Sequence, residues 1–451
     1  MLMHARTVAL IAGVLVTTLS GVAGAPPGAE TAGPAAAAAQ AQWRTLAGTQ
    51  RDAEATDALL RRLMGEYGVT ALSVAVVDAG RTVFERTLGM VDPATGKRAD
   101  ATTVFRAASL TKPVFAYLVM KLADEGVLDL DTPVHRYLKQ PLPAYPAYAS
   151  FRDDARYERL TARLLLSHQG GLPNWRRVRP DGPIEFHSNP GDRFAYSGEG
   201  YALLQFVIEN ITGRDLATLA RDKVFVPLGM NDTSFLWERR FDGRFAVELQ
   251  SGIGRFIACT REKGNAAGSI VTNASDYAKF LGAVLNGTGL KPGTRAVMLE
   301  PQVALTSKSL FSPPGTDGGA NVAHKMAWAA GWGRFEDSYG PALFHVGREE
   351  GCENYVQASL DRRLGVAIFS RTTNLRSFSA PLVDYTIDGS FSPLEWLEHT
   401  DSLVPPAFRG TWRGLFFGLA TLVVALVVLA RGLRWLPTRR VTYPTSSLRP
   451  D

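Results

Sequence analysis

The stretch Phe105-Arg-Ala-Ala-Ser-Leu-Thr-Lys-Pro113 decides the fold assignment, because it contains the only Ser-x-x-Lys in the sequence. A serine hydroxyl is a weak nucleophile until a neighbouring base takes its proton. Residues three apart share one face of a helix, so the Lys112 amine can lie beside the Ser109 oxygen. A buried lysine can lose its charge near neutral pH and then act as that base.

A Ser-x-x-Lys also arises by chance, so the motif alone is only a hypothesis. Two later segments support it. Pro190-Gly-Asp-Arg-Phe-Ala-Tyr196-Ser-Gly198 places a phenol among small residues. Phe344-His345-Val-Gly347-Arg348 places an imidazole before a glycine in a predicted strand, although a lone histidine there would equally fit a structural strand residue.

With these three motifs the chain resembles the serine β-lactamase and penicillin-binding-protein superfamily, in particular the branch of class C β-lactamases, D-alanyl-D-alanine carboxypeptidases and related esterases. That superfamily uses Ser-x-x-Lys, then Tyr-x-Asn or Ser-x-Asn, then Lys-Thr-Gly or His-Thr-Gly. The resemblance covers roughly residues 50–395. Further similar segments are Leu164-Leu-Leu-Ser-His-Gln-Gly-Gly-Leu-Pro173, Val226-Pro-Leu-Gly-Met-Asn-Asp-Thr-Ser-Phe235, Asn265-Ala-Ala-Gly-Ser269 and Ala330-Gly-Trp-Gly333.

The resemblance implies an α/β (α+β) fold of the β-lactamase/transpeptidase type over residues 46–400. We expect an antiparallel sheet of five or more strands, flanked by helices, and a mainly helical lobe. Helical periodicity is seen at residues 55–67, and a capped helix is expected from Asn273 to Leu285. Other predicted elements are strands at 72–77, 83–88, 342–345, 353–360 and 366–371, and a final helix packed on the sheet within 376–399.

The chemistry and the resemblance together assign roles to the site residues. Ser109 attacks an acyl carbonyl, Lys112 takes its proton, and Tyr196 shares that task or protonates the leaving group. Either Lys112 or Tyr196 can be the true base, since their titrations are coupled. His345 tunes the local field and the Tyr196 proton. By analogy with the family, the oxyanion is held by the backbone N–H groups of Ser109 and Arg348.

Two departures from the family pattern bear on the substrate. Gly198 stands where the family has an asparagine that binds the substrate and steadies the lysine, and Val346 replaces a hydroxyl residue between His345 and Gly347. Gly198 and Gly347 remain the predicted substrate-binding positions. Both departures argue against an efficient β-lactamase. The Arg348 side chain could restore an anion contact, but a solvent-facing strand residue is the simpler interpretation.

Other chemistries are not indicated by the sequence. There is no Gly-x-Ser-x-Gly, His-Glu-x-x-His or Gly-x-x-x-x-Gly-Lys-Ser/Thr motif, which disfavours an α/β-hydrolase, a zinc enzyme and a phosphate-binding loop. We therefore expect no cofactor and no metal. His168 is predicted to shape a turn near the site and not to take part in catalysis.

The two ends of the chain have the composition of targeting segments. Residues 1–25 are predicted to be a signal peptide, and residues 26–45 a flexible linker. Residues 412–431 are predicted to be a transmembrane helix, because 414–430 carry no charge and Trp412 and Trp435 flank them. A buried core helix is the alternative.

Residues 432–451 are predicted to be a basic cytoplasmic tail. The arginines from Arg431 to Arg449, less Asp451, supply +4 of the formal net charge of +6, so the charge indicates membrane orientation and not nucleic-acid binding. The catalytic domain is then expected outside the cytoplasmic membrane, as part of a single-pass protein. Cys259 and Cys352 could form a disulfide there, although two cysteines alone do not show proximity.

Three functions remain open from the sequence. The first is a serine hydrolase that forms an acyl-enzyme on esters or peptide-like amides. The second is a true β-lactamase or D-alanyl-D-alanine carboxypeptidase. The third is a membrane-tethered binding or sensor module whose catalytic site has decayed.

Overall fold

The structure, a computed structural model, describes residues 41–398 apart from 94, 176–181, 247–261, 312–318, 350, 373–374 and 389–390. The predicted signal peptide, transmembrane helix and basic tail lie outside the described residues, as do most of the linker and Cys259. Within the described ranges, no helix has the length and apolar character needed to cross a membrane.

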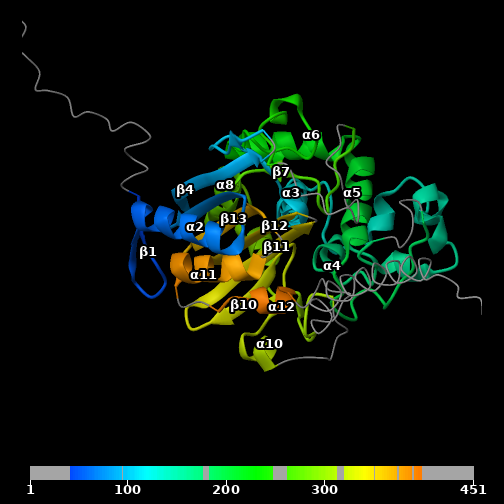
Figure 1. The fold of residues 1–451 in the computed structure, drawn as a ribbon. Helices are drawn as coiled ribbons and strands as arrows, with labels where there is room; N and C mark the ends of the chain where they lie inside the picture. Colours follow the sequence, from blue (N-terminus) through cyan, green and yellow to red (C-terminus); the bar gives the residue numbers. More distant parts are fainter. Residues whose placement is uncertain are drawn as a thin grey trace, which may run out of the picture.

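A nine-stranded antiparallel sheet forms the centre of the fold, in the order β5-β4-β3-β13-β12-β11-β10-β9-β8 (Figure 1). This confirms the predicted antiparallel sheet of five or more strands. Its strands are β3 (Ala71–Asp78), β4 (Arg81–Asp92), β5 (Lys97–Arg98), β8 (Val303–Ala304), β9 (Ala327–Trp328), β10 (Gly333–Asp337), β11 (Gly340–Glu349), β12 (Cys352–Ser359) and β13 (Leu364–Arg371).

Two hydrophobic cores lie on opposite faces of this sheet. Successive side chains of a strand point to opposite faces. In β3, accordingly, Leu72, Val74 and Val76 join one core, while Ala71 and Ala75 join the other. The first core is covered by α2 (Ala53–Tyr67) and α11 (Leu375–Ile387), and the second by α3 (Thr111–Asp124) and α8 (Ala274–Asn286).

Side chains and glycines cap the ends of α2 and α8, as the sequence predicted for the Asn273 end of α8. The Asp52 side chain accepts a hydrogen bond from the N–H of Ala55 at the start of α2, and Asn273 caps α8 by accepting from the N–H of Asp276. Both helices end at a glycine in the left-handed conformation, Gly68 and Gly287. The predicted helices at 55–67 and 273–285 are therefore confirmed.

The predicted helical lobe is also present, and in Figure 1 it lies to one side of the sheet around α4 and α5. The helices between β5 and β9 that have not yet been named are α4 (Ala162–Leu166), α5 (Gly198–Thr212), α6 (Leu216–Ala220), α7 (Val226–Leu228), α9 (Pro292–Leu299) and α10 (Gly319–Ala323). Short 3₁₀ turns precede them, namely η2 (Val134–Tyr137), η3 (Leu142–Ala144), η4 (Pro146–Phe151) and η5 (Ala155–Arg159).

Two boundary expectations were wrong. The flexible linker was expected to reach residue 45, but β1 (Gln42–Arg44) pairs with β2 (Gln50–Asp52). Trp43 is buried, and its indole N–H donates to the carbonyl of Thr386 in α11. One final helix was expected within 376–399, but the chain forms α11 and a separate α12 (Leu394–Glu398).

Candidate active site

Ser109 lies on a tight turn held between two elements. It is the middle residue of the 3₁₀ turn η1 (Ala108–Leu110), directly before α3. Ala108 has a φ of +49°, a left-handed conformation that non-glycine residues seldom adopt. Such strain persists only where the surroundings enforce it. Here the Asn354 amide of β12 holds the turn by donating to the carbonyl of Ala107, at 3.2 Å.

Gly347 allows β11 to approach this turn. A Cβ atom on Gly347 would lie 2.1 Å from the carbonyl oxygen of Ala107, so any side chain would push the strand away from η1. Close backbone approach is a common reason for glycine in a strand. The sequence predicted Gly347 as a substrate-binding position. In the structure Gly347 lies beside the turn η1, and its contact there is packing against the backbone of Ala107.

Lys112 lies beside the serine as the motif predicts. Its Nζ is 3.1 Å from Ser109 Oγ and donates a hydrogen bond to the carbonyl of Ala267 at 2.7 Å. The side chain is fully buried. Burial lowers the pKa of Lys112 to about 7, while the negative charge of Glu349 acts in the opposite direction. A large fraction of the amine is thus uncharged at neutral pH, as a general base requires.

Tyr196 and His345 lie close to this pair. Lys112 Nζ is 4.9 Å from the centre of the Tyr196 ring, and the Tyr196 and His345 rings are 6.4 Å apart. Tyr196 is 7% exposed and His345 is fully buried. The structure therefore brings all four predicted catalytic side chains together, while their roles remain predictions.

His345 is a neutral imidazole in this site. Burial, and secondarily the charge of Lys112, lowers its pKa to about 3. Its Nδ1 is 2.8 Å from the carbonyl of Val346, and since a carbonyl can only accept, the ring proton lies on Nδ1. Nε2 then presents a lone pair, so His345 would act as an acceptor near Tyr196 and not as a cation.

His168 contributes more than the turn that the sequence predicted. It does occupy a turn, with a φ of +58°. It is also fully buried, and its ring lies 4.3 Å from that of Tyr196. Its Nδ1 accepts the N–H of Ser197 at 3.0 Å, which leaves the ring proton on Nε2. Burial, followed by the nearby Lys112 amine, lowers the pKa of His168 well below its usual value.

At Gly198, where the family has an asparagine, a neighbouring loop occupies the space that the asparagine side chain would need. Gly198 begins α5, and a Cβ atom there would lie 2.5 Å from the Trp175 ring. The Asn174 side chain accepts the N–H of Gly198 at 3.1 Å. Trp175 in turn lies 5.9 Å from Lys112 Nζ. Sequence reasoning missed Asn174 and Trp175, because no motif connects them to Gly198, which lies 24 and 23 positions further along.

The backbone groups proposed for the oxyanion lie on the two elements that meet at Gly347. Ser109 belongs to η1, and Arg348 follows Gly347 on β11. In the described ranges β10 pairs with β11 only as far as Phe344, so this end of β11 extends beyond its neighbour. The Arg348 side chain does not simply face solvent as expected, because its guanidinium pairs with the Glu353 carboxylate at 2.8 Å.

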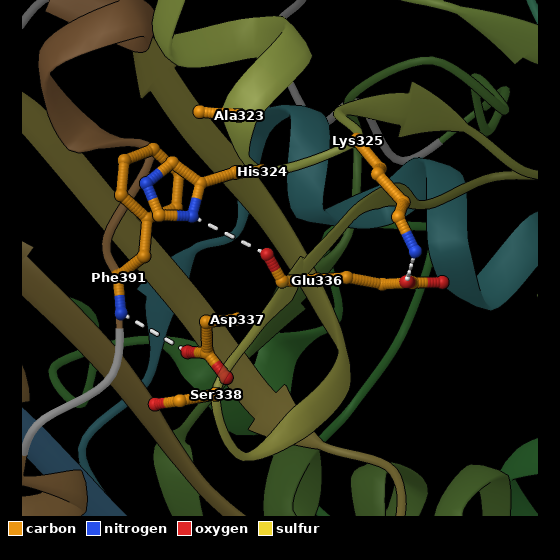
Figure 2. Close-up of a pocket in the computed structure, with 7 residues that line it drawn as sticks. All are labelled: Ala323, His324, Lys325, Glu336, Asp337, Ser338 and Phe391. Atoms are coloured by element: carbon orange, nitrogen blue, oxygen red, sulfur yellow. Dashed lines mark hydrogen bonds and ion pairs between the residues drawn. The ribbon is translucent and has the colours of Figure 1, made fainter.

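A separate pocket of about 660 Å³ lies at the opposite end of β11, near the β10–β11 turn (Figure 2). His324 stacks on Phe391 there, and Lys325 pairs with Glu336. None of the predicted site residues lines this pocket. Within the described ranges, no group of three or more His, Cys, Asp or Glu side chains could hold a metal ion. Cys352 is buried at the start of β12, and its pairing with Cys259 stays a prediction.

Comparison with known proteins identifies the family of this chain. The family model described as Beta-lactamase matches residues 56–383. The chain belongs to the beta-lactamase family. The resemblance drawn from the motifs is thereby confirmed, and the fold class with it.

Relatives in this family include enzymes of several kinds. "Esterase EstB" of Burkholderia gladioli is 30% identical over 43% of this chain, which spans about half (52%) of that protein. "Penicillin-binding protein 4" of Amycolatopsis lactamdurans is 26% identical over 73% of this chain and 90% of its own length. The solved structure of "EstCE1, a hydrolase with promiscuous acyltransferase activity" has a TM-score of 0.59 at 19% identity, covering 75% of this chain and 98% of that one, which shows the fold alone.

Proposed function

We propose that this protein is a serine hydrolase that forms an acyl-enzyme on Ser109 and hydrolyses an ester or peptide-like amide. The observation that carries the proposal is the 3.1 Å contact between Ser109 Oγ and a fully buried Lys112 whose pKa is about 7. Membership of a family that includes esterases and carboxypeptidases supports the same reaction type.

The reaction follows from this arrangement. Neutral Lys112 takes the proton of Ser109, and Ser109 Oγ attacks the acyl carbonyl. The backbone N–H groups of Ser109 and Arg348 would hold the developing oxyanion, which is usually the largest contribution to such catalysis. Tyr196 would then donate a proton to the leaving group, and water would release the acyl group by the reverse proton transfers.

A serine-directed probe tests the proposal. A fluorophosphonate should label the wild-type protein, and mass spectrometry of the peptides should place the adduct on Ser109. Ser109→Ala should not label. If the wild type and Ser109→Ala both fail to label while folding normally, the proposal is wrong and a binding or sensor module becomes the better interpretation.

A D-alanyl-D-alanine carboxypeptidase or β-lactamase is the second candidate. The specific observation in its favour is the match to 90% of the length of a penicillin-binding protein. Against it stand Gly198 and Val346 in place of the family's polar residues. Turnover of nitrocefin and of a D-alanyl-D-alanine peptide, compared with that of a p-nitrophenyl ester, separates the two.

We further propose that the catalytic domain is held at the outer side of the cytoplasmic membrane by residues 412–431, with residues 1–25 directing export. Support comes from the uncharged run at 414–430 and the arginines that follow it. Fractionation of cells that express the full chain, followed by alkaline carbonate extraction and protease accessibility, tests this. A domain released by carbonate, or protected from external protease in spheroplasts, would contradict it.

A further inference from the structure

Two aromatic side chains lie next to the proposed catalytic groups. The first is Trp175, which occupies the space next to Gly198 where the family carries an asparagine side chain. Its ring centre is 5.9 Å from Lys112 Nζ. The indole ring therefore places a large aromatic surface at this side of the site, next to Asn174, whose side-chain oxygen already accepts the N–H of Gly198.

The second is Phe311, on the other side of the phenol. Its ring stands edge-on to Tyr196, with the ring centres 5.5 Å apart. Phe311 is 43% exposed, which is unusual for a large apolar side chain in this protein. An exposed aromatic ring in contact with a buried tyrosine of the site is placed to touch a substrate. Because Tyr196 would protonate the leaving group, Phe311 lies on the leaving-group side.

The two arginines next to this part of the site already have carboxylate partners. Arg348 pairs with Glu353, and Arg106 pairs with Glu349 at 3.0 Å. All four side chains of these pairs are at most 20% exposed. A substrate carboxylate would have to displace a buried carboxylate partner to reach either guanidinium, which costs the interaction already made. Val346 offers no hydroxyl in their place.

We propose that this site selects uncharged esters with an apolar or aromatic group, and discriminates against substrates with a free carboxylate. Trp175 would contact the acyl part and Phe311 the alcohol part. The inference rests on the proposed serine hydrolase activity. It deepens that proposal by naming the substrate class and two specificity-determining residues.

Matched esters test the charge preference. p-Nitrophenyl pentanoate and mono-p-nitrophenyl glutarate share the same leaving group and a five-carbon acyl chain, but only the second carries a carboxylate. We expect kcat/KM to favour the pentanoate by about tenfold or more, the range that a pocket contact of this size provides. Equal turnover, or a preference for the glutarate, would overturn the proposal.

Variants test the two aromatic contacts. Trp175→Ala should lower kcat/KM for p-nitrophenyl phenylacetate more than for the acetate, and Phe311→Ala should lower the ratio of benzyl acetate to methyl acetate turnover. Each ratio should fall by about three- to tenfold. Met90→Ala is the matched control, since Met90 is 42% exposed on β4 and should leave both ratios unchanged. Trp175→Phe, which keeps an aromatic ring, replaces Trp175→Ala if the latter does not fold.

Labelling by the fluorophosphonate probe keeps this inference separate from the proposed function. If Ser109 labels in every variant but the substrate ratios do not change, the specificity assignment is wrong and the hydrolase assignment stands. If the folded wild type does not label, both fail together.

Discussion

The ring of His168 lies 4.3 Å from the ring of Tyr196, tilted by 39°. The two side chains come from loops that meet through backbone hydrogen bonds, because Ala195 donates to the carbonyl of His168 and Ser197 donates to its Nδ1. His168 thus packs against the phenol ring and is hydrogen-bonded to the residue that follows Tyr196. We regard it as a positioning residue for Tyr196.

This relationship predicts the behaviour of two His168 variants. Asn tolerates the left-handed backbone and its side-chain oxygen can accept the N–H of Ser197, so His168→Asn should fold. It should nevertheless lower kcat by about tenfold, with little change in KM, because Tyr196 loses the imidazole ring that packs against it. His168→Leu should also reduce the free energy of unfolding by about 1–3 kcal/mol, since a buried N–H loses its acceptor. Equal kcat in wild type and His168→Asn would remove the positioning role.

The Lys112 amine should dominate the chemistry. Lys112→Met preserves the length and burial of the side chain but removes the base, and general-base loss typically lowers the rate by about 10²–10⁴-fold. We expect kcat/KM to fall in that range, while circular dichroism and the melting temperature show a folded protein. A variant that retains more than a tenth of the activity would point to Tyr196 as the base.

The pH dependence follows from the same amine. Its pKa in the folded protein is about 7, below the ordinary value of 10.5, because burial disfavours the charge. Only the uncharged amine accepts a proton, so kcat/KM should rise with pH through about 7 and level off above it. A flat profile between pH 5.5 and 8.5 for a substrate that does not itself titrate would contradict the assignment.

The lowered pKa of Lys112 should also make the stability of the folded protein depend on pH, which can be measured without any substrate. Between pH 7 and 10.5 the unfolded chain binds more protons at Lys112 than the folded chain does, so this group makes the free energy of unfolding rise with pH in that window. Urea denaturation of wild type and Lys112→Met across pH 7–9 measures the effect. The free energy of unfolding of the wild type, minus that of Lys112→Met, should increase as pH rises. A difference that stays constant with pH would indicate an ordinary pKa for Lys112.

Because β11 packs closely against the turn η1, adding one methyl group at Gly347 should destabilise the protein. Gly347→Ala would place Cβ 2.1 Å from the Ala107 carbonyl, and such overpacking typically costs about 1–3 kcal/mol. We expect a lower melting temperature and reduced labelling of Ser109. Gly293→Ala is the control, because its Cβ meets no atom within 4 Å in α9 and alanine favours a helix. Similar melting temperatures for the two variants would show that η1 and β11 separate easily.

The sequence carried much of the fold, because its signals are local. The cap of α8 is read from one residue, Asn273, helix α2 from its apolar periodicity, and the buried strands from short apolar runs. The motif spacing likewise placed Lys112 beside Ser109, since one turn of helix connects them.

Contacts between distant segments could not be read in this way. Trp175 fills the space next to Gly198 from another loop, and His168 reaches Tyr196 across 28 positions of sequence. The pairing of Arg348 with Glu353 depends on the register of β11 and β12, which the sequence does not state. Each of these contacts joins segments that are far apart in the sequence or depends on strand register, so it becomes visible only in the three-dimensional arrangement.

The hydrogen bond from the Trp43 indole to the carbonyl of Thr386 has a practical consequence for expressing the hydrolase domain without its two ends. A clone that starts at residue 46, the boundary suggested by composition, would lack the Trp43 indole that packs against α11. It would also place Leu46, whose N–H donates to the carbonyl of Ile387, at the chain terminus. Starting the clone at or before Ala41 retains the strand that closes this seam.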